Sequence, residues 1–355
     1  MDYYSVAEIE TATANLAAKF PTLARLIVLP HVTAEGRTSR ALHLGAATNK
    51  AKPALMITGG VHAAEWGSCE IVLNLAVDLL AAYSRNLPLT YGGKTFSKVE
   101  VRNLLDTLDV IIFPLVNPDG RQFSRTTMGQ TQWRKNRNPA SADDDPMSVG
   151  VDINRNFKFL FNLDAFVPGT VSASTNPMHS TFQGGSAESE PETRNVKWLL
   201  DEYPQTCWFI DIHAPGQTMR YVWGDDEPQD DDSSMNFTDH DYDGARGEPS
   251  QGYREYLEAA DLVEMQRLAR CFATDLNAVA NTTYGVGPAF TFTPYSGTSH
   301  DYAYSRHLAD KTKAKVLGFF VEWGDANCQP DWLDMEPIIK EVCAGLIGFG
   351  IAAVR

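Results

Sequence analysis

A histidine and a glutamate stand three residues apart in a short segment that could bind a metal ion. His62 and Glu65 follow Gly59 and Gly60 directly, where an apolar run gives way to residues at helical spacing. Both side chains can therefore turn to one point above the edge of a sheet. Imidazole nitrogen and carboxylate oxygen are ligands of Zn²⁺, at about 2.0 to 2.2 Å. The pair predicts two ligands of a zinc site whose third ligand comes from elsewhere.

His213 is the best candidate for the third ligand. It ends an apolar strand over residues 208–212, so it is expected to emerge at the sheet edge. Three protein ligands leave a fourth coordination position for water. Each residue also has a structural alternative, because a glutamate at a helix start can stabilise the helix dipole and a histidine at a strand end can simply be packed.

Glu322 is a second carboxylate at the end of an apolar run, residues 316–321. A negative charge there is costly unless it lines a polar site. Glu322 is therefore a candidate for acid–base chemistry, and a structural salt bridge is the alternative.

Apolar runs typical of strands alternate with helical patterns along the whole chain. Strands are predicted at residues 23–29, 40–44, 54–57, 110–115, 208–213 and 316–322, and helices at 65–83, 98–105, from 191, at 259–279 and at 335–352. This alternation predicts an α/β fold: one domain over residues 1–355, with a mixed, mostly parallel twisted sheet covered by helices on both faces. Ligands bind such sheets where the strands end.

Seven phrases occur in the order seen in zinc carboxypeptidases of the carboxypeptidase A type, so the chain resembles that family from about Tyr3 to its C-terminus. The phrases are Gly60-Val61-His62 with Glu65-Trp66, Asn117-Pro118-Asp119-Gly120, Trp133-Arg134-Lys135, Gly150-Val151-Asp152-Ile153-Asn154-Arg155-Asn156, Ile212-His213, Ser296-Gly297-Thr298-Ser299-His300-Asp301 and Val321-Glu322. The resemblance implies a carboxypeptidase-like α/β/α sandwich. No segment resembles the family's inhibitory pro-domain.

The resemblance implies a role for each metal-site residue. One zinc ion per chain would be bound by His62, Glu65 and His213, and Asp152 would accept the second ring N–H of His62. Glu322 would take a proton from the attacking water and pass it to the leaving amine.

The resemblance also implies residues that bind a peptide with a free C-terminal carboxylate. Arg134 would face the oxyanion of the tetrahedral intermediate. Asn154 and Arg155 would hold the terminal carboxylate, Arg155 through a bidentate fork. This pair favours an exopeptidase over an endopeptidase.

The sequence departs from the family pattern at several positions. Ala64 replaces an arginine that contacts upstream substrate residues in the digestive relatives. Thr293 stands at the position of the family's mobile tyrosine, and Tyr295, two residues later, is the candidate substitute. His300 takes the floor of the pocket for the terminal side chain, and we expect a preference for aromatic or polar terminal residues over Lys and Arg.

Composition excludes several classes of protein. The formal net charge of −15 disfavours nucleic acid as a partner, because phosphate binding needs clustered Lys and Arg. No apolar run of the length of a membrane span is apparent, and no secretory leader, so we expect a cytoplasmic protein; a secreted protein whose leader was removed is the alternative. The five scattered cysteines argue against a disulfide framework, although one bridge is compatible with them.

One acidic stretch stands apart in composition. Residues 225–243 contain nine acidic residues and no Lys or Arg. We interpret the region around 225–255 as a solvated surface insertion, and a calcium site built from Asp239, Asp241 and Asp243 is the alternative.

Two rival functions remain to be compared with a carboxypeptidase. A related zinc amidase acting on cell-wall peptides or acylated amino acids would keep the metal ligands, but it often alters the carboxylate clamp, which Asn154 and Arg155 preserve here. A non-catalytic binding module should have lost a working residue, whereas Glu322 and all three ligands are present.

Overall fold

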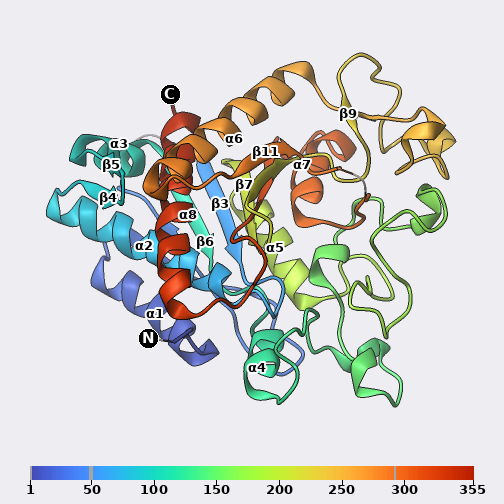
Figure 1. Cartoon of the computed structure of the whole chain (residues 1–355), viewed down its shortest axis with the longest axis horizontal. Helices are drawn as coiled ribbons and strands as arrows, with labels where there is room; N and C mark the ends of the chain where they lie inside the picture. Colours follow the sequence, from blue (N-terminus) through green and yellow to red (C-terminus); the bar gives the residue numbers. More distant parts are fainter. Residues whose placement is uncertain (1, 48–50, 292) are drawn as a thin grey trace.

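Eight strands form one mixed sheet at the centre of the molecule (Figure 1). The computed structural model describes residues 2–47, 51–291 and 293–355. Across the sheet the strands are β1 (Ala24–Val28), β2 (Arg40–Leu44), β6 (Asp109–Phe113), β3 (Ala54–Gly59), β7 (Thr206–His213), β12 (Leu317–Glu322), β8 (Thr218–Tyr221) and β11 (Gly285–Pro288). The four central strands β6, β3, β7 and β12 are parallel, so their carboxyl ends meet at one edge.

The central strands are apolar because helices cover both faces of the sheet. Every residue of β3 is buried, as are seven of the eight residues of β7, all except Cys207. Figure 1 shows α2, α6 and α8 together on one side of the sheet and α5 and α7 on the other. The predicted α/β/α sandwich is therefore confirmed.

The five predicted helices, α2, α3, α5, α6 and α8, begin and end near the predicted residues. The α-helices of the structure are α1 (Val6–Lys19), α2 (Gly67–Arg85), α3 (Lys98–Thr107), α4 (Pro118–Thr126), α5 (Pro191–Glu202), α6 (Ala259–Ala280), α7 (Ser299–Ala309) and α8 (Trp332–Ala353). Smaller elements are the hairpin β4 (Leu89–Tyr91) and β5 (Lys94–Phe96), the pair β9 (Pro228–Gln229) and β10 (Glu255–Tyr256), and 3₁₀ turns at Pro139–Ser141, Pro146–Ser148, Ile153–Arg155, Leu163–Ala165, His240–Tyr242 and Pro249–Gln251.

Sequence patterns did not predict α4, α7 or the strands β8 and β11. Most residues of α7 are buried, so the helix lacks the polar face that makes helical spacing visible. The strands β8 and β11 have four residues each, and β11 contains two glycines and a proline. Such short segments carry little periodic signal.

Helix α2 corrects one expectation, because it is long and apolar enough by itself to cross a membrane. In the structure 67% of its most apolar stretch is buried inside the molecule. It packs against α8, α3, α1 and β3. These contacts are typical of a core helix in a globular domain.

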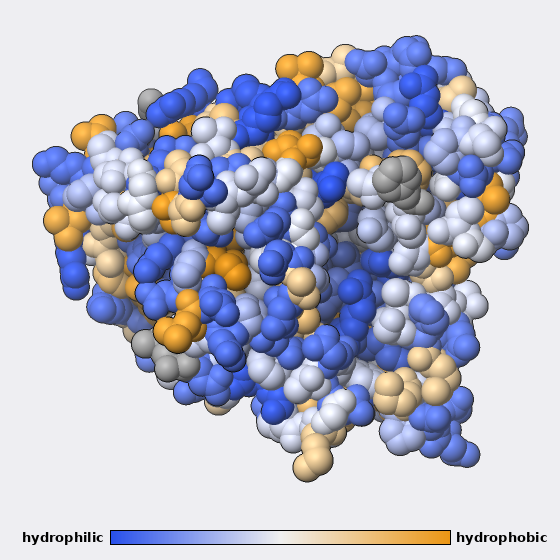
Figure 2. Space-filling model, in the orientation of Figure 1, coloured by the Kyte–Doolittle hydropathy of each residue, from blue (hydrophilic) through white to orange (hydrophobic). Residues whose placement is uncertain are grey.

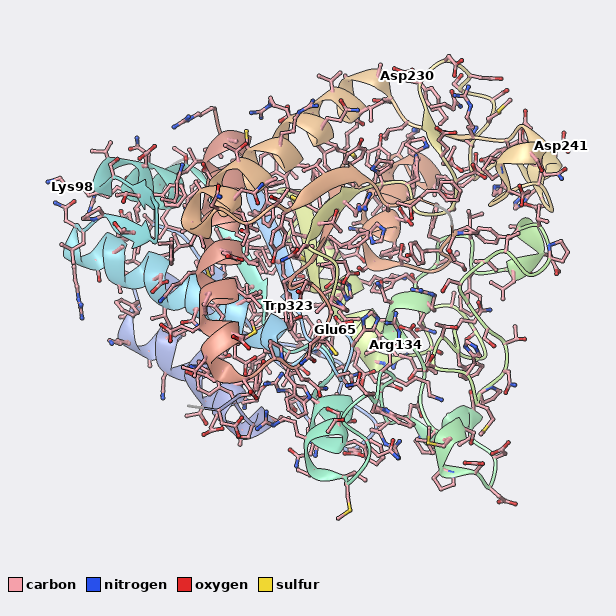
Figure 3. The ribbon with its side chains drawn as sticks, viewed as in Figure 1. Glu65, Lys98, Arg134, Asp230, Asp241 and Trp323 are labelled. Carbon is pink, nitrogen blue, oxygen red and sulfur yellow. The ribbon has the colours of Figure 1, made fainter. Side chains whose placement is uncertain are left out.

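The acidic region carries both exposed and buried charges. Asp230 and Asp241 lie at the periphery of the molecule, away from Glu65 and Arg134 (Figure 3). Beneath this surface the side chains of Asp225, Arg246 and Glu255 are fully buried. A purely solvated insertion was therefore too simple an interpretation.

Candidate metal centre and active site

The turn after β3 brings His62 and Glu65 to the carboxyl edge of the sheet. Gly60 has φ +65°, and a Cβ atom there would lie 2.6 Å from the Sγ atom of Cys69. Only glycine fits such a position without strain. The chain then continues directly into α2, so both side chains are held between a buried strand and a buried helix.

Three possible ligand atoms converge at this edge. The Nδ1 atom of His62 lies 2.7 Å from Oε1 of Glu65 and 3.0 Å from Nδ1 of His213. Nδ1 of His213 lies 3.1 Å from Oε2 of Glu65. All three residues are buried.

The chemistry of this donor set fits zinc. With the proton of each ring on Nε2, two Nδ1 lone pairs and a carboxylate face one point, and a cation relieves their repulsion. Among the residues that the structure describes, this is the one such group of His, Cys, Asp and Glu. The calcium interpretation of Asp239, Asp241 and Asp243 therefore gains no support.

A buried aspartate stands behind each histidine. Nε2 of His62 lies 3.3 Å from Oδ1 of Asp152, and Nε2 of His213 lies 2.9 Å from Oδ2 of Asp211. Oδ2 of Asp152 also accepts a hydrogen bond of 2.8 Å from Nε of Arg134. Asp152 was predicted from the family resemblance, whereas Asp211 was not predicted. The signal for Asp211 was a charged residue inside an apolar strand.

Glu322 lies beside the metal centre because of strand register. In the parallel pair of β12 and β7, Glu322 is paired with His213, so the two side chains point to the same face. Burial, with the nearby charge of Glu65, raises the pKa of Glu322 to about 8. A bound cation would oppose this shift and favour the carboxylate form.

The ligands themselves are strongly perturbed. Burial opposes ionisation, but His62 and His213 lower the pKa of Glu65 to about 2. Burial alone would lower the pKa of His213, but Asp211 and Glu65 raise it well above its usual range. A bound cation would take the place of the ring proton between His213 and Glu65, because metal ligands must be deprotonated.

Nine of the ten predicted site residues line a single cavity of about 360 Å³, and Asp152 lies directly behind it. The nine are His62, Glu65, Arg134, Asn154, Arg155, His213, Tyr295, His300 and Glu322. Figure 2 shows a hydrophilic hollow in the region where Figure 3, in the same orientation, places Glu65 and Arg134. Segments distant in sequence thus meet at the carboxyl edge of the parallel strands, as expected for this sheet.

The 3₁₀ turn Ile153–Arg155 carries two of these residues. The Arg155 guanidinium donates to the carbonyls of Ser172 and Asn154, and it lies over the Tyr295 ring, 5.1 Å from the centroid. Gly297 permits this arrangement, because it has φ +63° and a Cβ atom there would lie 2.2 Å from the Arg155 carbonyl oxygen. Arg155 is therefore fixed in direction with its remaining N–H groups available to a ligand.

His300 lies at the inner end of the cavity. It is 2% exposed, and neither of its ring nitrogens has a hydrogen-bond partner in the part of the chain that the structure describes. Its ring packs against Phe320, with centroids 4.7 Å apart. Burial lowers the pKa of His300 to about 3, so the imidazole is neutral and offers one donor and one acceptor.

The fold and the site together define an α/β protein with a His-Glu-His cluster that could hold a metal ion at the carboxyl edge of the parallel strands. The zinc carboxypeptidase family matches residues 9–337, and the chain belongs to this family. That match does not favour the amidase or the non-catalytic module.

Individual relatives agree with the family assignment. The chain is 30% identical over 330 residues to metallocarboxypeptidase A of Trichophyton tonsurans, covering 90% of this chain and 64% of that protein. It is 27% identical over 350 residues to carboxypeptidase A4 of Mus musculus, covering 96% and 70%. The chain thus spans less than two thirds of the fungal relatives that it matches.

Solved structures share the fold. Thrombin-activatable fibrinolysis inhibitor superposes with a TM-score of 0.75 at 20% identity, over 99% of this chain and 74% of that one. Carboxypeptidase A from Helicoverpa armigera gives a TM-score of 0.72 at 21% identity, over 99% and 73%.

Proposed function

We propose that this protein removes single amino acids from the C-terminal end of peptides, with one zinc ion held by His62, Glu65 and His213. The observation that carries the proposal is the convergence of three ligand atoms in the cavity that also contains Glu322 and Arg155. Metal, base and carboxylate-binding group together match the needs of exopeptidase chemistry. Residues 1–355 would act as a single catalytic domain, with the region around 225–255 as an insertion.

Glu322 would act as the general base and then the general acid. Zinc, when bound, lowers the pKa of water and polarises the peptide carbonyl. A carboxylate oxygen of Glu322 accepts a proton from the attacking water and later gives it to the leaving amine. The side chain is well placed because strand register holds it beside His213.

Arg134 would stabilise the oxyanion that develops on the former carbonyl oxygen. Its Nε is held by Asp152, which leaves the outer nitrogens directed at the cavity. A fixed cation acts most strongly on charge that appears in the transition state.

Asn154 and Arg155 would bind the terminal carboxylate of the substrate. Arg155 supplies N–H groups in a planar fork, which suits two carboxylate oxygens. Tyr295, held against Arg155, would cover this end of the substrate. A substrate without a free terminal carboxylate would leave Arg155 buried and unpaired.

His300 would contact the side chain of the terminal residue. Its two unpaired nitrogens favour a residue that can donate or accept a hydrogen bond, and the Phe320 ring favours an aromatic one. A neutral imidazole carries no negative charge that would pair with the cation of Lys or Arg. Release rates from peptides ending in Phe, Tyr, Gln, Lys and Arg test this preference, and a strong preference for Lys or Arg would refute it.

The central proposal is tested by metal analysis together with hydrolysis of an N-blocked dipeptide. We expect about one zinc per chain, release of the free C-terminal amino acid, loss of activity in a chelator and recovery with added Zn²⁺. The same dipeptide with an amidated C-terminus is the matched control and should be cleaved far more slowly. Equal cleavage of the two substrates, or full activity without metal, would contradict the proposal.

A further inference from the structure

Asp211 is a fully buried carboxylate in the middle of an apolar strand, and none of the motifs discussed above includes it. Burying an ionised carboxylate is costly unless it is paired and hydrogen-bonded. Its partners therefore indicate its purpose.

Strand geometry places Asp211 next to the metal centre. Asp211 and His213 are two residues apart on β7, so both side chains point to the same face of the sheet. Thr58 on β3 is paired with Asp211 in register, and its Oγ1 donates a hydrogen bond of 2.7 Å to Oδ1 of Asp211.

The other carboxylate oxygen has two partners. Oγ of Ser299 lies 2.6 Å from Oδ2 of Asp211, and Nε2 of His213 lies 2.9 Å from the same atom. An ionised carboxylate only accepts hydrogen bonds, so all three neighbours must donate to it. The proton of the His213 ring is thereby held on Nε2.

We propose that Asp211 is a positioning residue that fixes the orientation and tautomer of His213, so that the Nδ1 lone pair faces the metal. This inference rests on the proposed zinc centre. Asp211 would be the counterpart of Asp152, which stands behind His62. Two buried carboxylates would then make both imidazoles more basic metal ligands and tighten metal binding.

Ser299 extends this arrangement toward the substrate site. Its backbone N–H donates a hydrogen bond of 2.8 Å to Oδ1 of Asn154, while its hydroxyl donates to Asp211. Ser299 is the first residue of α7, so a buried helix start donates to one carboxylate oxygen of Asp211 while Thr58 donates to the other.

The test is the zinc dissociation constant of Asp211→Asn, measured by competition with a chromophoric chelator. We expect an affinity about 10- to 100-fold weaker than that of the unchanged protein. An altered visible spectrum of the Co²⁺-substituted variant is expected as well, because the ligand geometry at His213 changes. Neither readout depends on peptide hydrolysis.

Asp119→Asn is the matched control. Asp119 is also fully buried and also accepts a hydrogen bond from a threonine, Thr33, but it lies outside the cavity of the metal centre. This variant should lose stability and keep the zinc affinity. A merely structural role for Asp211 would make the two variants behave alike.

Ser299→Ala and Thr58→Val keep the test decisive if Asp211→Asn does not fold. Each removes one hydrogen bond to Asp211, and we expect zinc affinity to fall several-fold. Unchanged zinc affinity in the folded variants would overturn the inference. The proposed function would still stand if the unchanged protein binds zinc and hydrolyses the peptide. Failure of the unchanged protein to bind zinc would overturn both.

Discussion

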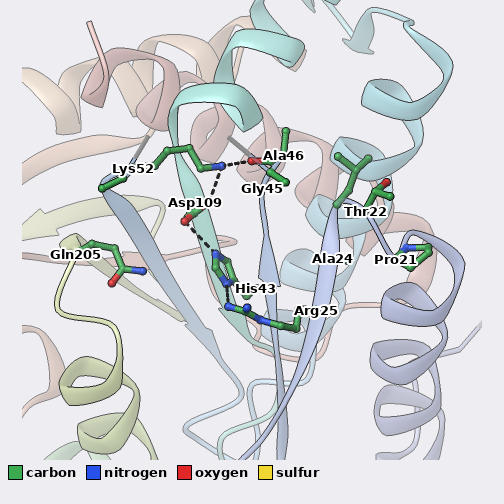
Figure 4. A pocket seen from close by; sticks show the side chains of 13 residues that line it. Pro21, Thr22, Ala24, Arg25, His43, Gly45, Ala46, Lys52, Asp109 and Gln205 are labelled. Carbon is green, nitrogen blue, oxygen red and sulfur yellow. Dashed lines mark hydrogen bonds and ion pairs between the residues drawn. The ribbon is translucent and has the colours of Figure 1, made fainter. Parts of the chain in front are cut away.

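Two edges of the same sheet each gather a histidine and a carboxylate in a cavity, but among the described residues only one edge brings three possible metal-ligand atoms to a single point. At the carboxyl edge, His62, Glu65 and His213 direct three acceptors at one point. At the opposite edge, where β3 and β6 begin, a cavity of about 470 Å³ contains His43 and Asp109 (Figure 4).

The charged groups of the second edge satisfy one another. Figure 4 shows a chain in which Arg25 contacts His43, His43 contacts Asp109 and Asp109 contacts Lys52, at 2.6, 3.1 and 2.6 Å. The Lys52 ammonium also donates to the carbonyls of Ala46 and Leu105. Donors and acceptors alternate along this chain, so no ligand is needed to complete it.

The difference teaches that convergence of ligand atoms on one point, and not cavity size or residue type, distinguishes a candidate metal site from a structural network. The second cavity is larger, about 470 Å³ against 360 Å³, yet its charged groups are paired with one another. The metal centre is smaller and holds acceptors that a cation would stabilise.

Replacing one histidine at each edge of the sheet should give the largest difference between the two cavities. His62→Ala removes a ligand atom, so zinc content and peptide hydrolysis should both fall to background. His43→Ala should keep zinc and kcat/KM and lose about 1 to 3 kcal/mol of unfolding free energy, because Arg25 and Asp109 lose their shared partner. Metal analysis, turnover and denaturant unfolding on both variants check this, and equal zinc loss would break the comparison.

Glu322→Gln separates chemistry from metal binding at the same edge. The amide keeps the size of the side chain but cannot accept the proton of water, so kcat should fall by about 10²- to 10⁴-fold. Zinc content should stay at the level of the unchanged protein. Substantial residual turnover with zinc bound would remove Glu322 as the base.

The sequence was informative about this edge because its residues stand where predicted strands end. The strands ending near His62, His213 and Glu322 could each be recognised from apolar runs, and parallel strands bring their carboxyl ends together. The meeting of His213 with Glu65 could not be derived from the residues alone, because strand order depends on long-range packing. The family resemblance supplied that order.

Other features had no local signal. Asp211 becomes meaningful only through partners on β3, β7 and α7, which are far apart in the chain. The buried helix α7 lacks a polar face, and the network at Asp109 depends on strand register. Sequence patterns report burial and periodicity, whereas these features arise from tertiary contacts.

Asp109→Ala breaks the structural network without touching the metal centre. The ammonium of Lys52, whose side chain is 8% exposed, would lose its only carboxylate partner among the described residues. We expect a loss of about 2 to 4 kcal/mol of unfolding free energy and unchanged kcat/KM.

The double variant Asp109→Leu with Lys52→Met serves as its control. Removing both charges should restore part of the stability, because no unpaired ion stays buried. Denaturant unfolding of Asp109→Leu, Lys52→Met and the double variant gives the coupling free energy between the two residues. A drop in kcat/KM that exceeds the drop in folded fraction would show that this edge contributes to function after all.

Asp225 gives the smallest expected effect. It is buried, and among the described residues its carboxylate oxygens have no hydrogen-bond partner and belong to no convergent metal group. Burial, with the nearby charge of Asp226, raises its pKa to about 7. A carboxyl whose pKa is higher in the folded than in the unfolded protein binds more protons when folded. Its contribution to stability is therefore complete below about pH 4 and is lost as the pH rises to about 7.

Asp225→Asn removes this titration. The unfolding free energy of the unchanged protein minus that of the variant should fall with rising pH, by at most about 1.4 kcal/mol per pH unit between pH 5 and 7. Urea unfolding at several pH values measures the difference, and a flat difference would show that Asp225 is ionised throughout. Zinc added to either protein should leave the slope unchanged, because an unpaired buried carboxylate without converging partners is a cost of folding and not a ligand.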